Sequence, residues 1–151
     1  MATKWLTPQE MAAWRAFIAA SNDLWRVVDR DLEVHGLDGG DYQLLAMLSE
    51  APDQRLRMCD LAETLHLTRS GLTRRMDGVL KKKLVARVQS TEDGRVAYAQ
   101  LTSRGVDLLK VVAPEHLRTV RRLMFDVLTP AEVKSIATGL GKVAANLESD
   151  A

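Results

Sequence analysis

The chain has 151 residues, the length of one domain, and its 21 Lys and Arg nearly balance its 20 Asp and Glu. Its single cysteine, Cys59, excludes an intramolecular disulfide and gives structural zinc little support. Charges interrupt the first long apolar stripe, so we expect no signal peptide, no membrane segment and a cytoplasmic location. The interrupting residues are Arg15, Asp23, Arg26 and Asp29.

Both ends of the chain repeat one helix-start pattern. Residues 6–11 and 128–133 each show an apolar residue, Thr, Pro, a variable residue, Glu and an apolar residue. The threonine hydroxyl can cap the first turn, proline suits its first position, and the glutamate can bond back to the cap. We expect the first helix to end near His35 and Gly36, and the last to run through Leu147.

Between these ends we expect one short helix at about residues 41–49 and another at about 58–65, with the segment near Leu56 unassigned. Thr68 can cap a further helix, and Leu67 and Leu72 can form a hydrophobic staple at its start. Apolar residues recur along this helix at helical spacing, which predicts one buried face. They are Leu72, Met76, Val79 and Leu80.

The opposite face of this helix is polar and basic. At about 100° per residue it carries Ser70, Arg74, Asp77 and Lys81, with Thr73 on the flank and Arg69 in the first turn. A basic helix face is often simply solvated. Here the helix follows a capped turn and precedes a hairpin, which solvation alone does not explain, so the pattern favours a helix that reads a DNA duplex.

Two short segments with alternating character follow, at residues 85–89 and 96–101, and they predict paired strands. The residues between them favour a turn, and we expect Gly94 to adopt a positive φ at the tip. Arg95 would then lie near the tip, where its guanidinium can enter a narrow minor groove and Asp93 can pair with it. The alternative is an ordinary exposed turn whose ion pair contributes little.

After the hairpin, Thr102 can cap a long helix that Pro114 should kink. The expected fold is mainly α with a small β wing, in a single domain. A winged helix-turn-helix occupies about residues 37–101, and residues 6–36 and 102–148 form the flanking helices. The chain contains no linker, repeat or low-complexity segment.

Positive charge is concentrated on the predicted winged helix. Residues 55–95 hold ten basic and five acidic residues, a net charge of +5, which leaves −4 for the rest of the chain. A local basic patch on a nearly neutral protein suits neutralisation of DNA phosphates. It does not indicate a membrane surface.

A set of motifs runs through the same segment. They are Leu61-Ala62, Leu67-Thr68-Arg69-Ser70-Gly71-Leu72-Thr73-Arg74, Leu80, Leu84-Val85-Ala86-Arg87, Glu92-Asp93-Gly94-Arg95 and Leu101-Thr102-Ser103-Arg104-Gly105. Together they resemble the multiple-antibiotic-resistance regulator (MarR) family of bacterial winged-helix transcription factors. The resemblance implies an obligate homodimer, a recognition helix in the major groove, wings in the flanking minor grooves and usually a small effector that weakens DNA binding.

Two positions depart from the family pattern. Lys83 stands where the family usually has glycine, and a left-handed helix end is costlier for a residue with a Cβ. Gly78 stands where a good helix former is usual, and a glycine inside a helix costs about 1 kcal/mol relative to alanine.

The helix and wing together supply the predicted DNA-binding set, in which Thr68 caps the helix and Asp93 orients the wing. We expect Ser70, Thr73 and Arg74 near base edges. We expect phosphate contacts from Arg69, Arg75, Lys81 and Arg87, and a minor-groove contact from Arg95.

The long apolar terminal helices can pack within one subunit or on the same helices of a partner, and their length favours a two-fold homodimer. Two recognition helices roughly 34–36 Å apart can read successive major grooves, which predicts a palindromic operator. We therefore expect a homodimeric, sequence-specific regulator of transcription. We interpret it as a repressor that a small effector releases, although the sequence itself does not distinguish repression from activation.

The sequence does not indicate an enzyme, a metal site or a cofactor. His35, His66 and His116 lie in different predicted elements, and no metalloprotease, phosphate-loop or nucleophile motif is present. A cavity for a small aromatic, phenolic or anionic effector is the one ligand site that we expect, with plain core packing as the alternative. Its predicted lining is Trp14, Arg15, Trp25, His35, Met47, Met58 and His116.

Cys59 should be a small, semi-buried residue in the first helix of the helix-turn-helix. The alternative is redox sensing through its thiol. A competing function for the whole chain is a winged-helix module that binds proteins or senses oxidants without reading DNA.

Overall fold

The computed structural model describes residues 4–91 and 93–149, in two compact units that divide directly after Pro114. The first unit, Met1–Pro114, holds most of the elements, and the second unit is Glu115–Ala151. The helix α5 (Ser103–Leu123) continues through Pro114 from one unit to the other. The predicted kink at Pro114 stays a prediction, because the two units are described separately.

The first unit contains four helices before α5, and three strands. The helices are α1 (Pro8–Glu33), α2 (Gly39–Glu50), α3 (Met58–Thr64) and α4 (Arg69–Lys81). The strands are β1 (Arg55–Arg57), β2 (Val85–Gln89) and β3 (Ala97–Leu101), and a 3₁₀ turn at Pro52–Gln54 precedes β1. In the second unit a 3₁₀ turn at Phe125–Val127 leads to α6 (Pro130–Ser149). The predicted fold class, mainly α with a small β wing, is confirmed.

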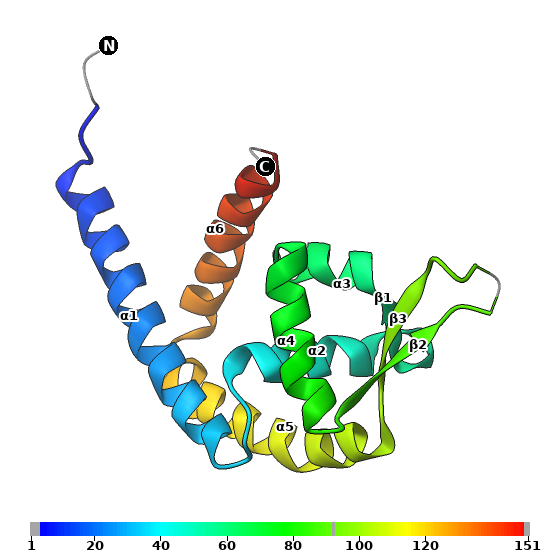
Figure 1. Cartoon of the computed structure of the whole chain (residues 1–151). Helices are drawn as coiled ribbons and strands as arrows, with labels where there is room; N and C mark the ends of the chain where they lie inside the picture. Colours follow the sequence, from blue (N-terminus) through cyan, green and yellow to red (C-terminus); the bar gives the residue numbers. More distant parts are fainter. Residues whose placement is uncertain (1–3, 92, 150–151) are drawn as a thin grey trace. The chain divides into compact units, whose positions relative to one another are not determined.

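The strands form one antiparallel sheet in the order β1-β3-β2. Leu56 of β1 lies opposite Ala99, and Val88 of β2 lies opposite Tyr98. The β2–β3 pair is the predicted hairpin, and it projects away from α2, α3 and α4 (Figure 1). The strand β1, which occupies the segment near Leu56, was not predicted from the sequence.

Threonine caps begin four helices, as predicted. At α1 the Thr7 hydroxyl accepts from the Glu10 N–H at 3.2 Å, and the Glu10 carboxylate accepts from the Thr7 N–H at 2.7 Å. The same reciprocal pair joins Thr129 and Glu132 at α6. These backbone hydrogen bonds hold the pKa of both glutamates below the usual value. At α4 and α5 the caps are Thr68 and Thr102.

A single hydrophobic core lies within the first unit, formed by the C-terminal end of α1, the helices α2 to α5 and the sheet. The predicted apolar stripe of α4 is part of it, since Leu72, Met76 and Val79 are buried and Leu80, partly buried, packs against the core. From α1 only Val28 and Leu32 are buried. The remaining buried core residues are Leu37, Leu44, Leu45, Leu48, Leu61, Leu84, Val85, Ala99, Leu101, Leu109 and Val112.

Three helices end in a left-handed residue. Gly36 after α1 has φ 71°, His66 after α3 has φ 50° and Lys83 after α4 has φ 59°. At α4 the Lys83 N–H donates to the Leu80 carbonyl at 2.9 Å and the Leu84 N–H to the Val79 carbonyl at 3.0 Å. This is the paired hydrogen bonding of a Schellman end, which glycine favours. Lys83 thus adopts the left-handed conformation despite its Cβ, and the altered corner considered from the sequence does not occur.

The corner between α4 and β2 is tightly packed against the start of α5. The Thr102 hydroxyl lies 2.8 Å from the Lys83 carbonyl oxygen and 3.0 Å from that of Leu84, and it accepts from the Gly105 N–H at 3.1 Å. A Cβ on Gly105 would stand 2.3 Å from the Leu84 carbonyl oxygen. Only glycine therefore fits there without a backbone shift.

The hairpin tip differs from the prediction. Gly94 does not have a positive φ. The link between the strands is long enough to close with a β-turn in which the Val96 N–H donates to the Asp93 carbonyl at 2.9 Å, and the Ser90 N–H bonds the Val96 carbonyl at 2.8 Å. A turn of this length does not need the mirror-image geometry of a two-residue hairpin.

In the second unit, no residue of α6 that the structure describes is buried. Leu140, Val143 and Leu147 are 42%, 54% and 63% exposed. Among the described residues, no helix is long and apolar enough to span a membrane.

We expect Lys83→Gly to raise the free energy of unfolding by about 1 kcal/mol, because glycine adopts the left-handed conformation without the steric cost of a Cβ. Urea denaturation of both proteins measures the difference. Lys83→Ala is the matched control, since it removes the same ammonium and keeps a Cβ. An equal gain from Lys83→Ala would contradict the backbone explanation.

Candidate DNA-reading surface

The face of α4 opposite the core is exposed along its length. Ser70, Thr73, Arg74, Asp77 and Lys81 are all exposed, and Arg69 is exposed in the first turn. This agrees with the predicted orientation of the helix.

The first turn of α4 is held by its own side chains. The Thr68 hydroxyl accepts from the Gly71 N–H at 3.1 Å and lies 3.2 Å from the Ser70 hydroxyl. The Thr73 hydroxyl donates to the Arg69 carbonyl at 2.9 Å. The two threonines thus stabilise the helix start, and the basic side chains of Arg69 and Arg74 extend into solvent beside them.

Arg75 is partly buried and Lys82 is exposed, and both side chains are engaged in ion pairs. The Arg75 guanidinium forms ion pairs with Asp38 and Asp41, and the Lys82 ammonium lies 2.6 Å from Asp41. Both acidic residues belong to the start of α2. The phosphate role of Arg75 stays a prediction, and Nη1 of its guanidinium already bonds two carboxylates of its own chain.

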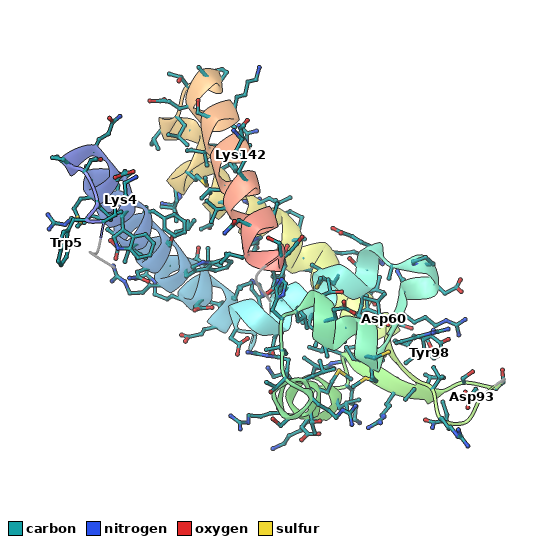
Figure 2. The ribbon with its side chains drawn as sticks, turned by 90° about the horizontal axis from the view of Figure 1, so that it is seen from above. Lys4, Trp5, Asp60, Asp93, Tyr98 and Lys142 are labelled. Carbon is teal, nitrogen blue, oxygen red and sulfur yellow. The ribbon has the colours of Figure 1, made fainter. Side chains whose placement is uncertain are left out.

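The wing presents Arg87 on β2 and Arg95 in the β2–β3 link, both exposed. The Asp93 carboxylate accepts from the backbone N–H of Arg95 at 2.9 Å, and the backbone N–H of Asp93 donates to the Ser90 hydroxyl at 3.3 Å. Figure 2 shows Asp93 close to the outer end of the hairpin. Among the residues that the structure describes, no ion pair joins the side chains of Asp93 and Arg95, so the predicted charge-assisted pair is replaced by a backbone contact.

Comparison with known proteins identifies this arrangement. A sequence model of the MarR family matches residues 35–96. The chain is 33% identical to AbsC, a MarR family transcriptional regulator from Streptomyces coelicolor, with a TM-score of 0.93 over 97% of this chain and 99% of that one. The chain belongs to the MarR family.

Two further relatives agree. The MarR family transcriptional regulator Sco3205 from Streptomyces coelicolor, solved in complex with DNA, is 37% identical, with a TM-score of 0.92 over 97% of this chain and 92% of that one. The HTH-type transcriptional regulator MhqR from Bacillus subtilis is 29% identical over 79% of this chain and 80% of its own length. The protein is therefore a MarR-family DNA-binding transcriptional regulator, and not an enzyme.

The two basic residues of β1 were not assigned a role from the sequence. Arg55 and Arg57 of β1 are exposed, and the Arg55 guanidinium carbon lies 5.0 Å from the centre of the Tyr98 ring. A hydrogen bond with Tyr98 raises the pKa of Arg57 above its usual value. Their alternation around Leu56 was the available signal, but three residues are too few to identify a strand.

The structure does not gather the predicted effector residues into one cleft. Trp14 and Trp25 are 54% and 57% exposed. Trp25 lines a shallow depression on α1, whereas His35 lines a different cleft of about 420 Å³ together with Gly36, Lys82, Leu84, Arg104 and Leu108.

The other predicted pocket residues are scattered. Arg15 is exposed, and Met47 and Met58 are half-buried in the first unit. His116 belongs to the second unit, where burial lowers its pKa.

Cys59 is exposed and not semi-buried, because it lies in the first turn of α3 on a side that the core does not cover; its sulfur lies 3.1 Å from an Asp60 carboxylate oxygen. Within residues 4–91 and 93–149, no group of three or more His, Cys, Asp or Glu side chains could hold a metal ion.

Proposed function

We propose that this MarR-family protein is a homodimeric repressor that binds a palindromic operator through α4 and the β2–β3 wing. The observation that carries the proposal is the division of α4 into a buried apolar face and an exposed face with Ser70, Thr73, Arg74 and Lys81. A helix held in this way can present side chains to base edges in a major groove. Bound DNA in the Sco3205 structure supports the same use of the fold.

The exposed residues of α4 and the wing can be grouped by the part of the DNA duplex that we assign to each. Ser70, Thr73 and Arg74 project from the first two turns of α4, and we assign them to base edges, with Thr68 holding the first turn. Arg69, Lys81 and Arg87 are assigned to phosphates. Arg95 is assigned to the minor groove, with Asp93 fixing its backbone. Arg75 is left out of the set, because Asp38 and Asp41 already engage its guanidinium.

Selection of bound duplexes from a random pool should yield two half-sites related by a two-fold axis and about one helical turn apart. Arg74→Ala should lose about 1–3 kcal/mol of binding free energy and relax one base position in each half-site. The matched control is Arg118→Ala, which removes an exposed arginine of the second unit. Selection of no symmetric site, together with no effect of Arg74→Ala, would refute the proposed function.

The homodimer is proposed from apolar surface that the single chain leaves uncovered. On α1, Trp14 and Phe17 are 54% and 45% exposed. On α6, Leu140, Val143 and Leu147 recur at helical spacing and are exposed as well. Large apolar side chains left exposed along a helix are typical of a protein interface. We propose that residues 6–36 and 102–148 supply the dimer contacts, and that residues 37–101 read DNA.

Sedimentation velocity should show a dimer at micromolar concentration, and Leu147→Asp should shift it towards monomer, because a charge would be buried in an apolar interface. Thr138→Asp is the matched control, since Thr138 lies on the opposite face of α6 from Leu140 at about 100° per residue. A monomeric wild-type protein, or equal effects of the two substitutions, would exclude an interface on this face.

A small acidic effector is proposed for the cleft lined by His35, Lys82 and Arg104. The cationic side chains suit a carboxylate or phenolate, and Leu84 and Leu108 suit an aromatic body. Of the residues predicted from the sequence, His35 is the one that lines this cleft.

A thermal-shift screen with aromatic acids and phenols should raise the unfolding midpoint in a concentration-dependent manner, because a ligand that binds the folded state stabilises it by mass action. Arg104→Gln should weaken the shift, and Lys110→Gln, at an exposed position on the same helix, should leave it unchanged. No shift across the panel would exclude this class of effector and favour signalling through the exposed Cys59.

A further inference from the structure

The helix α4 is joined to α2 through a buried carboxylate. Asp41 is 5% exposed, and its two carboxylate oxygens accept from two different cations. One accepts from Arg75 Nη1 at 3.0 Å and the other from Lys82 Nζ at 2.6 Å. Arg75 and Lys82 are seven residues apart, which is two helical turns, so both cations reach Asp41 from one side of α4.

Asp38 links the same arginine to the start of α2. Its carboxylate accepts from the Asp41 N–H at 2.7 Å, which caps α2, and it also accepts from Arg75 Nη1. Partial burial raises the pKa of Asp38, but the hydrogen bonds from Arg75 and the Asp41 backbone outweigh burial and hold the pKa below its usual value. Hydrogen bonding to Asp38 likewise raises the pKa of Arg75. Asp38 and Arg75 are therefore held in their ionised forms at neutral pH.

Gly40 makes room for this arrangement. A Cβ at residue 40 would lie 2.5 Å from Arg75 Nη2 and 2.6 Å from Arg75 Cζ. The guanidinium therefore occupies the space that a side chain at this position of α2 would fill. The ion-pair network therefore requires a residue without a side chain at position 40, as well as two acidic and two basic groups.

We propose that Asp38, Asp41, Arg75 and Lys82 form a clamp that sets the position of α4, and that Arg75 and Lys82 are positioning residues and not phosphate contacts. The inference rests on the proposed function, in which α4 reads the major groove. Each clamp cation has an exposed basic neighbour in the sequence, Arg74 beside Arg75 and Lys81 beside Lys82. A rotation of α4 that broke the clamp would redirect both exposed neighbours.

The adjacent basic residues provide matched pairs of variants. Arg74→Gln should relax one base position per half-site, whereas Arg75→Gln should lower affinity for the selected operator by about tenfold or more and weaken discrimination at all positions that α4 reads. On non-specific duplex, Lys81→Gln should reduce the slope of log affinity against log salt by about 1, and Lys82→Gln should leave that slope unchanged. Slopes reduced equally by Lys81→Gln and Lys82→Gln would overturn the clamp.

Gly40→Ala tests the clamp with every charge retained. The added methyl should displace the Arg75 guanidinium and reproduce the loss of discrimination, and Gly78→Ala, whose methyl meets no atom within 4 Å, should not. This variant remains decisive if Arg75→Gln does not fold, because alanine suits the helix α2 better than glycine. Discrimination equal to wild type in Gly40→Ala would overturn the inference. A wild-type protein without operator preference would instead refute the proposed function itself.

Discussion

The geometry of the DNA-reading surface depends on one buried carboxylate, that of Asp41. Burial of an ionised carboxylate is strongly unfavourable unless its oxygens accept hydrogen bonds or pair with cations. Removing one partner of a buried ion pair is destabilising, because the remaining charge stays buried without compensation. Arg75 and Lys82 satisfy one oxygen each. Because both cations belong to α4 or its cap, the helix cannot slide or rotate on α2 without leaving that carboxylate unpaired. An apolar contact alone would tolerate such sliding, since hydrophobic attraction has no direction.

The ends of α4 are restrained in a different way, through the backbone. Its start is capped by Thr68 after a turn in which His66 is left-handed. Its end is closed by the left-handed Lys83 and covered by the Thr102 hydroxyl, with Gly105 in close contact with the Leu84 carbonyl. The β2–β3 wing begins directly after this corner. The helix and the wing therefore share one rigid junction, which suits a surface whose parts must enter neighbouring grooves together.

The sequence predicted those features whose causes lie within a few residues of each other. The caps at Thr7, Thr68, Thr102 and Thr129 are local in this sense. β1 was missed because its pairing partner, β3, is about forty residues away, and a three-residue strand has no periodicity of its own. The ion pairs of Arg75 could not be predicted for the same reason, since Asp38 and Asp41 are 37 and 34 residues distant. Basic residues at neighbouring positions look alike in a sequence, and only tertiary contacts distinguish Arg74 from Arg75.

Lys82 connects the clamp to the cleft that holds His35 and Arg104. Its ammonium bonds Asp41 on one side, and its side chain lines the cleft on the other. An acid bound in the cleft would attract the Lys82 ammonium, which also pairs with Asp41. The ligand and Asp41 would therefore compete for the same cation. A ligand changes a conformational equilibrium only as far as it prefers one state, and competition for Lys82 supplies such a preference. Under the proposed function, an effector in this cleft would act by weakening one of the two ion pairs of Asp41, and it would not need to contact the exposed face of α4.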